Sequence, residues 1–308
     1  MSFLTLLAAL MLERFRPLPR AVQADRLLAH LADFLESRFN AGERRHGLIA
    51  WLLGIGGLVL LSGGLTLLLD GCHPLLGGLW NVALLYWLID FRRANHFFTE
   101  IQIALRMDNL PQARRMLGEW QESSAESFPA TDIARVAIER LTEVAHRHIF
   151  APLTWFLLIP GPIGPIVYRA AGVLAGTWST GRFGEADHFG EVARQTFAII
   201  DWLPLRLSAV ILAVAGDFES AMYSWRAQID KWHALDMGIV LAAMAGALGV
   251  RLRLRPAGTG DRADRGQVGG GGEADVEIME SAVGLIWRAL MWWLLLSLLL
   301  GLASLVGG

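Results

Sequence analysis

The feature that most constrains this chain is an uninterrupted apolar run from Leu48 to Leu69, which contains no charged residue. A hydrocarbon layer roughly 30 Å thick is crossed by about 20 helical residues, so this run is long enough to span it. In lipid, only helices and closed barrels satisfy every backbone hydrogen bond, and no segment of the chain alternates with the period of a strand. We therefore predict an all-α, polytopic integral membrane protein with about four to six transmembrane helices.

The rest of the chain supports a membrane protein. Hydrophobic residues make up 54% and charged residues 18%, which is too little polar surface to cover a soluble globule of 308 residues. The apolar block Ile149–Gly176 is interrupted by several prolines and predicts a hairpin or a broken helix, because proline removes a backbone donor that lipid cannot replace. The run Phe3–Leu12 lacks a preceding basic residue and predicts a packed, uncleaved helix. The other candidate spans are 74–89, 203–215, 237–250 and 283–306.

The arginines predict an orientation. They cluster in residues 13–47 and 90–149, whereas the intervening loop Asp70–His73 contains no arginine or lysine. The positive-inside rule places both arginine-rich segments, and the tail after Arg251, in the cytoplasm. We expect a multi-pass protein of the bacterial inner membrane, with the lipid bilayer around it. A net charge of −2 gives no reason to expect nucleic acid as a partner.

Composition changes divide the chain. Residues 90–149 form the largest polar block, in which Pro111 predicts the first turn of a helix. Residues 13–47 place apolar side chains at helical spacing and predict an amphipathic helix. Residues 256–275 include the run Gly269–Gly272 and predict a flexible linker. The predicted parts are a membrane domain (1–255) with the cytoplasmic helical segment 90–149, a Gly-rich linker (256–275) and a C-terminal transmembrane helix (276–308).

Several short sequence motifs in this chain are distinctive. The strongest is Ala242–Leu252, which reads AAMAGALGVRL. The others are Ile149–Phe156, Tyr168-Arg169-Ala170, Asp201–Ala209 with its Pro-x-Arg-Leu, and Ala104–Leu117. Together they resemble the CobD/CbiB family of membrane proteins over roughly residues 90–255. The resemblance implies a role in cobalamin biosynthesis, an adenosylcobinamide-phosphate synthase type of activity on a corrinoid substrate, and ATP and Mg²⁺ as cofactors if that activity is retained.

The polar motifs expected from the resemblance differ in this chain. An expected Glu-Asn-x-x-Asp-Gly before Ala151 keeps only Glu143, and an expected Asn-Thr-Leu-Asp reads Gly172–Ala175. An expected Arg-Asp-Thr after Leu117 and an expected Ser-Pro-Asn-Ser-Gly before Ala242 are also replaced. Because Mg²⁺ and phosphate depend on such polar groups, the chain reads as a synthase-like scaffold with eroded catalytic motifs. Whether it is an enzyme, an ATP-dependent amide ligase, stays open, and no catalytic residue is assigned.

The beginning of the chain has a second resemblance. The apolar run leading into Glu13-Arg14-Phe15, followed by Gln23–Arg26, is similar to AmpE, the divergent branch of the same superfamily. This implies an alternative function, a non-catalytic membrane signalling or regulatory protein of the β-lactamase-induction type, with another membrane protein as its partner.

Four residues are candidates for ligand binding. Arg169 and Arg206 lie in or beside apolar segments, where a charge is costly unless it binds something or is paired. Each could contact a phosphate or a corrinoid carboxylate, or simply snorkel at a helix end. Arg251 could bind an anionic group or act as a positive-inside anchor. Asp108 could bind a ligand or cap the next helix.

Two glutamates are candidates for a metal ion. Glu139 and Glu143 lie four residues apart on one helical face, so they could ligate Mg²⁺ or form an ordinary solvated face with nearby arginines. His146 and His148 are two apart and point to different faces, which is poor spacing for one metal. We expect both histidines at the surface.

Overall fold

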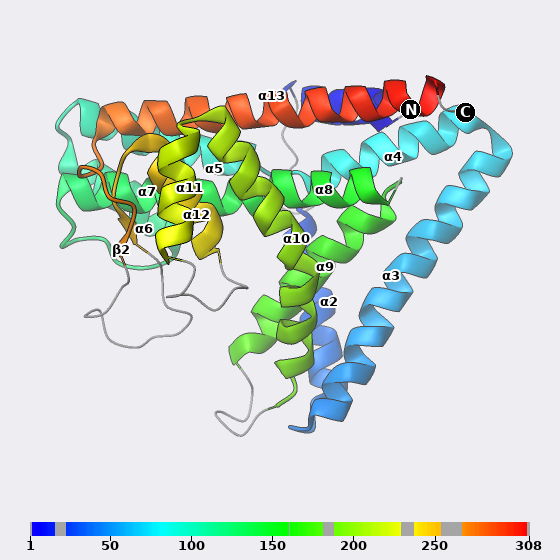
Figure 1. The fold of residues 1–308 in the computed structure, drawn as a ribbon. Helices are drawn as coiled ribbons and strands as arrows, with labels where there is room; N and C mark the ends of the chain where they lie inside the picture. The colour runs from blue at the N-terminus through cyan, green and yellow to red at the C-terminus, as the bar shows by residue number, and fades with distance from the viewer. Residues whose placement is uncertain are drawn as a thin grey trace. The chain divides into compact units, whose positions relative to one another are not determined.

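A computed structural model describes residues 2–15, 23–159, 161–180, 188–228, 237–253 and 267–306 (Figure 1). The elements are almost all helices, so the all-α prediction is confirmed. The chain forms two compact units. Unit 1 comprises Met1–Asp90, Ala151–Pro204 and Leu294–Gly308, and unit 2 comprises Phe91–Phe150 and Leu205–Trp293.

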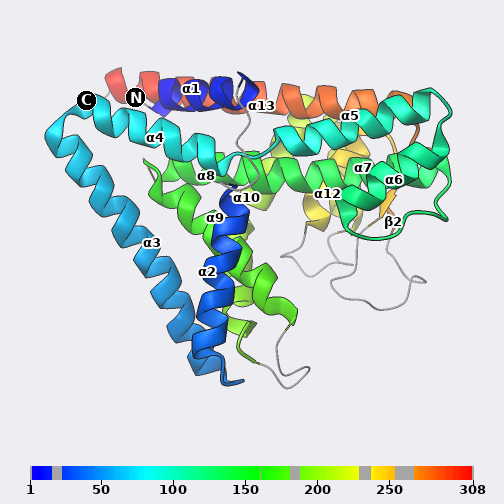
Figure 2. The same ribbon diagram turned by 180° about the vertical axis from the view of Figure 1, so that it is seen from behind.

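Unit 1 is built on the long apolar helix that the sequence predicts. Helices α2, α3 and α9 lie side by side (Figure 2), and their small and branched side chains form one core that includes Leu28, Ala50 and Leu174. The amphipathic helix predicted within residues 13–47 is α2, while residues 16–22 lie outside the described part. Unit 1 contains α1 (Ser2–Phe15), α2 (Ala24–Phe39), α3 (Arg44–Cys72), α4 (Pro74–Leu88), α8 (Ala151–Leu158), α9 (Ile163–Thr177), η3 (Trp178–Thr180) and the first part of α10 (Glu191–Ala215).

The proline-rich block folds as a hairpin, one of the two forms that its prolines predict. Helix α8 ends before Gly161, which adopts φ +107°, and α9 begins after Pro162. A Cβ at Gly164 would lie 2.7 Å from the carbonyl oxygen of Trp155, so a glycine is needed for the two helices to approach this closely.

Unit 2 is built on shorter helices. Helix α6 begins where Pro111 predicts, and the side chain of Asn109 caps it by accepting a hydrogen bond from the backbone N–H of Gln112 at 3.2 Å. Asp108 lies in the preceding turn at φ 52°, so the alternative in which Asp108 caps this helix is wrong. Unit 2 contains α5 (Arg92–Arg106), α6 (Leu110–Gln121), α7 (Ala130–Ala145), η2 (His146–Phe150), α11 (Phe218–Gln228), α12 (Gly238–Leu248), β1 (Leu252–Arg253), β2 (Gln267–Val268) and parts of α10 and α13 (Val276–Val306).

The glycine run of the predicted linker packs against the end of α12. Gly249 ends that helix at φ 66°, and β1 pairs with β2 in an antiparallel register. A Cβ at Gly271 would lie 1.7 Å from the carbonyl oxygen of Gly249, and one at Gly269 would lie 2.2 Å from that of Val250. These glycines therefore allow a close backbone approach, and residues 267–275 are folded against their neighbours. Residues 254–266 lie outside the described part, and the division into domain, linker and C-terminal helix stays a prediction.

Four helices among the described residues are long and apolar enough to cross a membrane. The predicted span 203–215 begins earlier, at Glu191, because Ala193 packs into the core of unit 1. The predicted span 237–250 is the 11-residue helix α12, which is too short to cross a bilayer by itself. The four are Arg44–Cys72, the stretch Pro74–Arg106 that includes α4 and α5, Glu191–Ala215 and Val276–Ala303.

Candidate functional site

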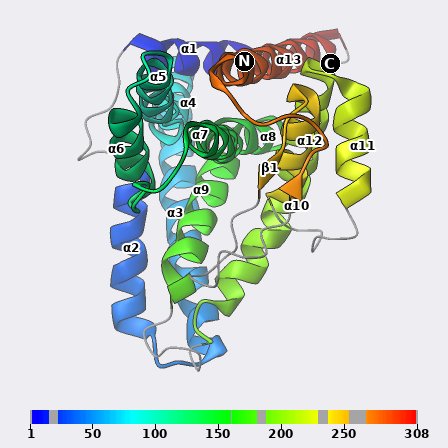
Figure 3. The ribbon, with the colours of Figure 1, turned by 90° about the vertical axis from the view of Figure 1, so that its left-hand side faces the viewer.

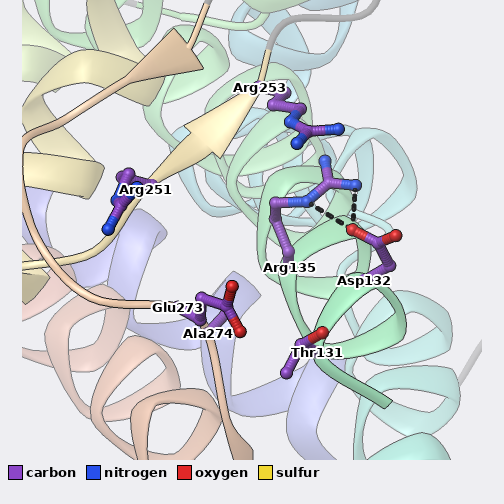
Figure 4. Close-up of a pocket in the computed structure, with 7 residues that line it drawn as sticks. All are labelled: Thr131, Asp132, Arg135, Arg251, Arg253, Glu273 and Ala274. Carbon is purple, nitrogen blue, oxygen red and sulfur yellow. Dashed lines mark hydrogen bonds and ion pairs between the residues drawn. The ribbon is translucent and has the colours of Figure 1, made fainter. Parts of the chain in front are cut away.

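A cavity of about 80 Å³ in unit 2 collects charged side chains from three segments. One wall is the beginning of α7, another is the segment around β1, and the third leads into α13 (Figure 4). Because α7 and α12 both contact β1 (Figure 3), segments far apart in the sequence meet here. We call this the arginine cavity; its lining is Thr131, Asp132, Arg135, Arg251, Arg253, Glu273 and Ala274.

Arg135 is held on two sides. Its Nη2 lies 2.7 Å from Oδ1 of Asp132, and its Nη1 lies 2.9 Å from Oε1 of Glu139, which is 5% exposed. Burial acts to lower the pKa of Arg135, but the charge of Glu139 and hydrogen bonds to Asp132 and Glu139 outweigh it and raise the pKa. This guanidinium is therefore charged and fixed in position.

Glu139 joins α7 to β1. The same oxygen, Oε1, accepts a hydrogen bond from the backbone N–H of Arg253 at 2.6 Å. Arg251 is fixed separately, since its Nε donates to the carbonyl oxygen of Gly271 at 2.7 Å and its backbone N–H donates to that of Gly272 at 2.9 Å. Within the described residues, the terminal nitrogens of Arg251 and the guanidinium of Arg253 have no hydrogen-bond acceptor or acidic partner.

The two predicted metal ligands are both engaged by arginines. Glu139 binds Arg135 as described above, and Glu143 lies 2.9 Å from Nη1 of Arg140 and 3.2 Å from Nη1 of Arg147. Within the described ranges no group of three or more His, Cys, Asp or Glu side chains is arranged to hold a metal ion. As placed, these carboxylates do not fit Mg²⁺.

The other predicted residues lie elsewhere. Arg169 is buried in unit 1 and forms an ion pair with Asp25 of α2, a partner that the sequence does not predict. Arg206 is half-buried on α10 in unit 2, and Asp108 is exposed in the turn before α6. Of the six candidates, only Arg251 lines the arginine cavity, while Glu139 lies behind it. The binding roles of the remaining candidates stay predictions.

Sequence reasoning missed Arg135 and Arg253. A signal for Arg253 exists, because residues two apart in an extended segment point to the same side and Arg251 is two residues earlier. The surface prediction for His146 is wrong, since this ring is fully buried with its Nδ1 2.9 Å from Oγ of Ser208. His146 begins the π-helical turn η2, which interrupts the regular helical spacing on which the prediction depends.

These features define a polytopic α-helical membrane protein whose second unit carries an arginine-lined cavity. The sequence pattern of the CobD/Cbib protein family matches residues 6–286, and the chain belongs to this family. The resemblance to the CobD/CbiB family, which the sequence motifs indicate, is therefore confirmed.

Individual relatives cover most of the chain. It is 32% identical over 96% of its length to the cobalamin biosynthesis protein CobD of Stutzerimonas stutzeri (strain A1501), of which it covers 97%. It is 32% identical over 73% of its length to CobD of Chromobacterium violaceum, covering 72% of that protein. It is 24% identical over 79% of its length to the cobalamin biosynthesis protein CbiB of Salmonella typhimurium, covering 77%. No solved structure matches, and nothing in these comparisons favours the AmpE-like alternative.

Proposed function

We propose that this chain serves cobalamin biosynthesis as a membrane protein that acts on a corrinoid. The observation that carries the proposal is the extent of the similarity, since the match to a relative named for this pathway covers 96% of the chain and 97% of the relative. A match of this extent includes both units, so the proposal applies to the whole chain. The activity expected from the family resemblance is of the adenosylcobinamide-phosphate synthase type.

We also propose that the arginine-rich segments face the cytoplasm and that the membrane is the bacterial inner membrane. The arginines before α3 and after α4 support this orientation, because basic loops are retained on the cytoplasmic side. Residues 131–135 of the arginine cavity belong to the segment that we propose to lie in the cytoplasm.

Complementation tests the function. The chain is expressed at native level in a bacterium that lacks its own CobD or CbiB protein and whose growth depends on a corrinoid precursor. We expect growth to be restored, as with the CobD protein of Stutzerimonas stutzeri as positive control. A corrinoid from beyond the missing step should restore growth even with empty vector, which locates the defect. If the chain accumulates in the membrane as the control does but growth fails, the proposal is wrong.

A further inference from the structure

We propose that the outer face of α2 lines a water-filled crevice, which enters the membrane-embedded part of unit 1 from the end where α3 begins. The proposal concerns unit 1 alone and goes beyond the proposed function, on which it does not depend. It follows from two outer faces of opposite chemistry, one on α2 and one on α3, at the same level of the apolar run.

The inner face of α2 packs at the level of that run. Its buried side chains between Leu28 and Leu35 share one core with Ala50 and Ile55 of α3 (Figure 2). Both of these α3 residues belong to the uncharged run Leu48–Leu69. Helix α2 therefore lies beside the part of α3 that is apolar enough to cross the membrane.

The outer face of α3 is apolar at this level. Leu52 and Leu53 are 55% and 53% exposed, and Leu60 and Leu61, farther along the helix, are 77% and 71% exposed. Lipid tails solvate such side chains well, whereas contact with water is unfavourable. This side of α3 therefore faces hydrocarbon.

The outer face of α2 is polar. Arg26, His30, Asp33 and Ser37 are all exposed, and they follow one another at intervals of three or four residues. That spacing places them in one stripe along the helix, on the side away from its buried residues. In the part of the chain that the structure describes, neither Arg26 nor Asp33 has an ion-pair partner.

Lipid does not suit this stripe. Hydrocarbon offers Arg26 and Asp33 no hydrogen-bond partner, so contact with lipid tails would leave two charges unsolvated. The two residues are separated by about 10 Å along the helix, which is too far for them to pair directly. An arginine can snorkel to the membrane surface, but the side chain of Asp33 is too short to do so. Water along the stripe solvates both charges.

Apolar side chains bound the crevice on one side. Leu27 and Phe34 are 47% and 62% exposed. They lie beside the stripe, about a quarter-turn around the helix from it. The polar surface of α2 is therefore narrow and ends at these two residues.

The deep end of the crevice reaches a charge pair. Because α2 ends at Phe39 and α3 begins at Arg44, the beginning of α2 lies deepest. Asp25 is in this first turn and forms an ion pair with Arg169 of α9; their side chains are 44% and 6% exposed. Water in the crevice hydrates Asp25, and a polar solute can approach this pair without crossing lipid.

The test is cysteine labelling in membranes, in a Cys72→Ser background. H30C and D33C each place one thiol on the stripe, and L53C is the matched variant on the lipid-facing side of α3. R45C is the accessible control, because the side chain of Arg45 is 89% exposed at the beginning of α3. A charged, membrane-impermeant maleimide is applied to inside-out vesicles and to spheroplasts, and total thiol is measured after denaturation.

We expect H30C and D33C to react from the same side of the membrane as R45C. Their rates should exceed that of L53C by at least about tenfold, because maleimide reacts with the thiolate, which forms in water and not in hydrocarbon. The unfolding midpoint of each variant in detergent shows whether it is folded. H30C and D33C both leave the buried face of α2 unchanged, so either one can carry the test if the other fails to fold.

Three labelling results would overturn the proposal. If H30C and D33C react as slowly as L53C, lipid or a partner protein covers α2. If L53C reacts as fast as H30C, this part of α3 lies outside the membrane. If the stripe reacts only from the side opposite to R45C, the crevice does not open where α3 begins.

A second readout measures contact with lipid directly. H30C, D33C and L53C are labelled with a membrane-permeant bimane and reconstituted with lipids that carry bromine on their acyl chains. Bromine should quench the label of L53C and leave the labels on the stripe nearly unquenched. Equal quenching at the three positions would show that lipid tails cover α2 and would contradict the crevice.

Discussion

Replacing Glu139 with alanine should destabilise unit 2 by about 3 kcal/mol. The carboxylate is 5% exposed and accepts charge-assisted hydrogen bonds from Arg135 and from the backbone N–H of Arg253. Losing the charge-assisted hydrogen bond from Arg135 costs roughly 1.5–3 kcal/mol. Leaving the backbone N–H of Arg253 without its acceptor costs roughly 1–3 kcal/mol more. Asp132 still binds Arg135, which keeps the total toward the lower part of that range.

The assay is thermal unfolding of the full chain in detergent, followed by tryptophan fluorescence. A change of 1 kcal/mol moves the midpoint by roughly 2–4 °C in a domain of 150–250 residues, so E139A should lower it by roughly 6–12 °C. E143A is the matched control on the same helix. Glu143 pairs with two half-exposed arginines, and its loss should cost less than about 1 kcal/mol because surface ion pairs are screened by water.

The two variants also separate the ion-pair interpretation from the metal interpretation. If Glu139 and Glu143 together held Mg²⁺, Mg²⁺ would raise the midpoint of the wild type, and both variants would lose that increase equally. That outcome, or an equal loss of stability in E139A and E143A without the ion, would refute the reasoning about Glu139.

Three further outcomes follow from the structure. G271A should lower the free energy of unfolding by about 1–3 kcal/mol, because the new Cβ meets the carbonyl oxygen of Gly249. G270A should be nearly neutral, because nothing lies within 4 Å of its Cβ position. Equal unfolding midpoints in the two variants would contradict the close-approach argument. N109A should cost about 1 kcal/mol by removing the cap of α6, and an unchanged midpoint would show that the cap is dispensable. Cys72 is exposed at the end of α3 and should react with a membrane-impermeant maleimide applied outside spheroplasts. A cysteine at exposed Ser124, in a Cys72→Ser background, should react only after permeabilisation. The reverse labelling pattern would invert the proposed orientation.

Local sequence signals were sufficient for several elements. The uncharged run from Leu48 to Leu69 predicts α3, and the prolines after Leu158 predict the α8–α9 hairpin. Pro111 marks the beginning of α6. In each case the cause acts within a few residues, through hydrophobicity or through the backbone geometry that proline imposes.

The glycine run Gly269–Gly272 predicts a flexible linker, whereas the structure shows it packed against the end of α12. Gly269–Gly272 has the composition of a flexible linker, but two of these glycines lie against the backbone of Gly249 and Val250. Glycine permits both flexibility and close packing, and the sequence does not distinguish them. The difference depends on which distant segment lies beside the run.

The sequence by itself determined that this is a helical membrane protein of the CobD/CbiB family. The length of an apolar span and the motifs of a family are both properties of contiguous residues. It also indicated Arg251 as a candidate for ligand binding, but not Arg135 or Arg253, which line the same cavity. Only the tertiary structure brought Arg135, Arg251 and Arg253 to one cavity and joined the carboxylate of Glu139 to the backbone of Arg253. Those outcomes depend on contacts between residues more than 100 positions apart, which the pairing of α7 with β1 decides.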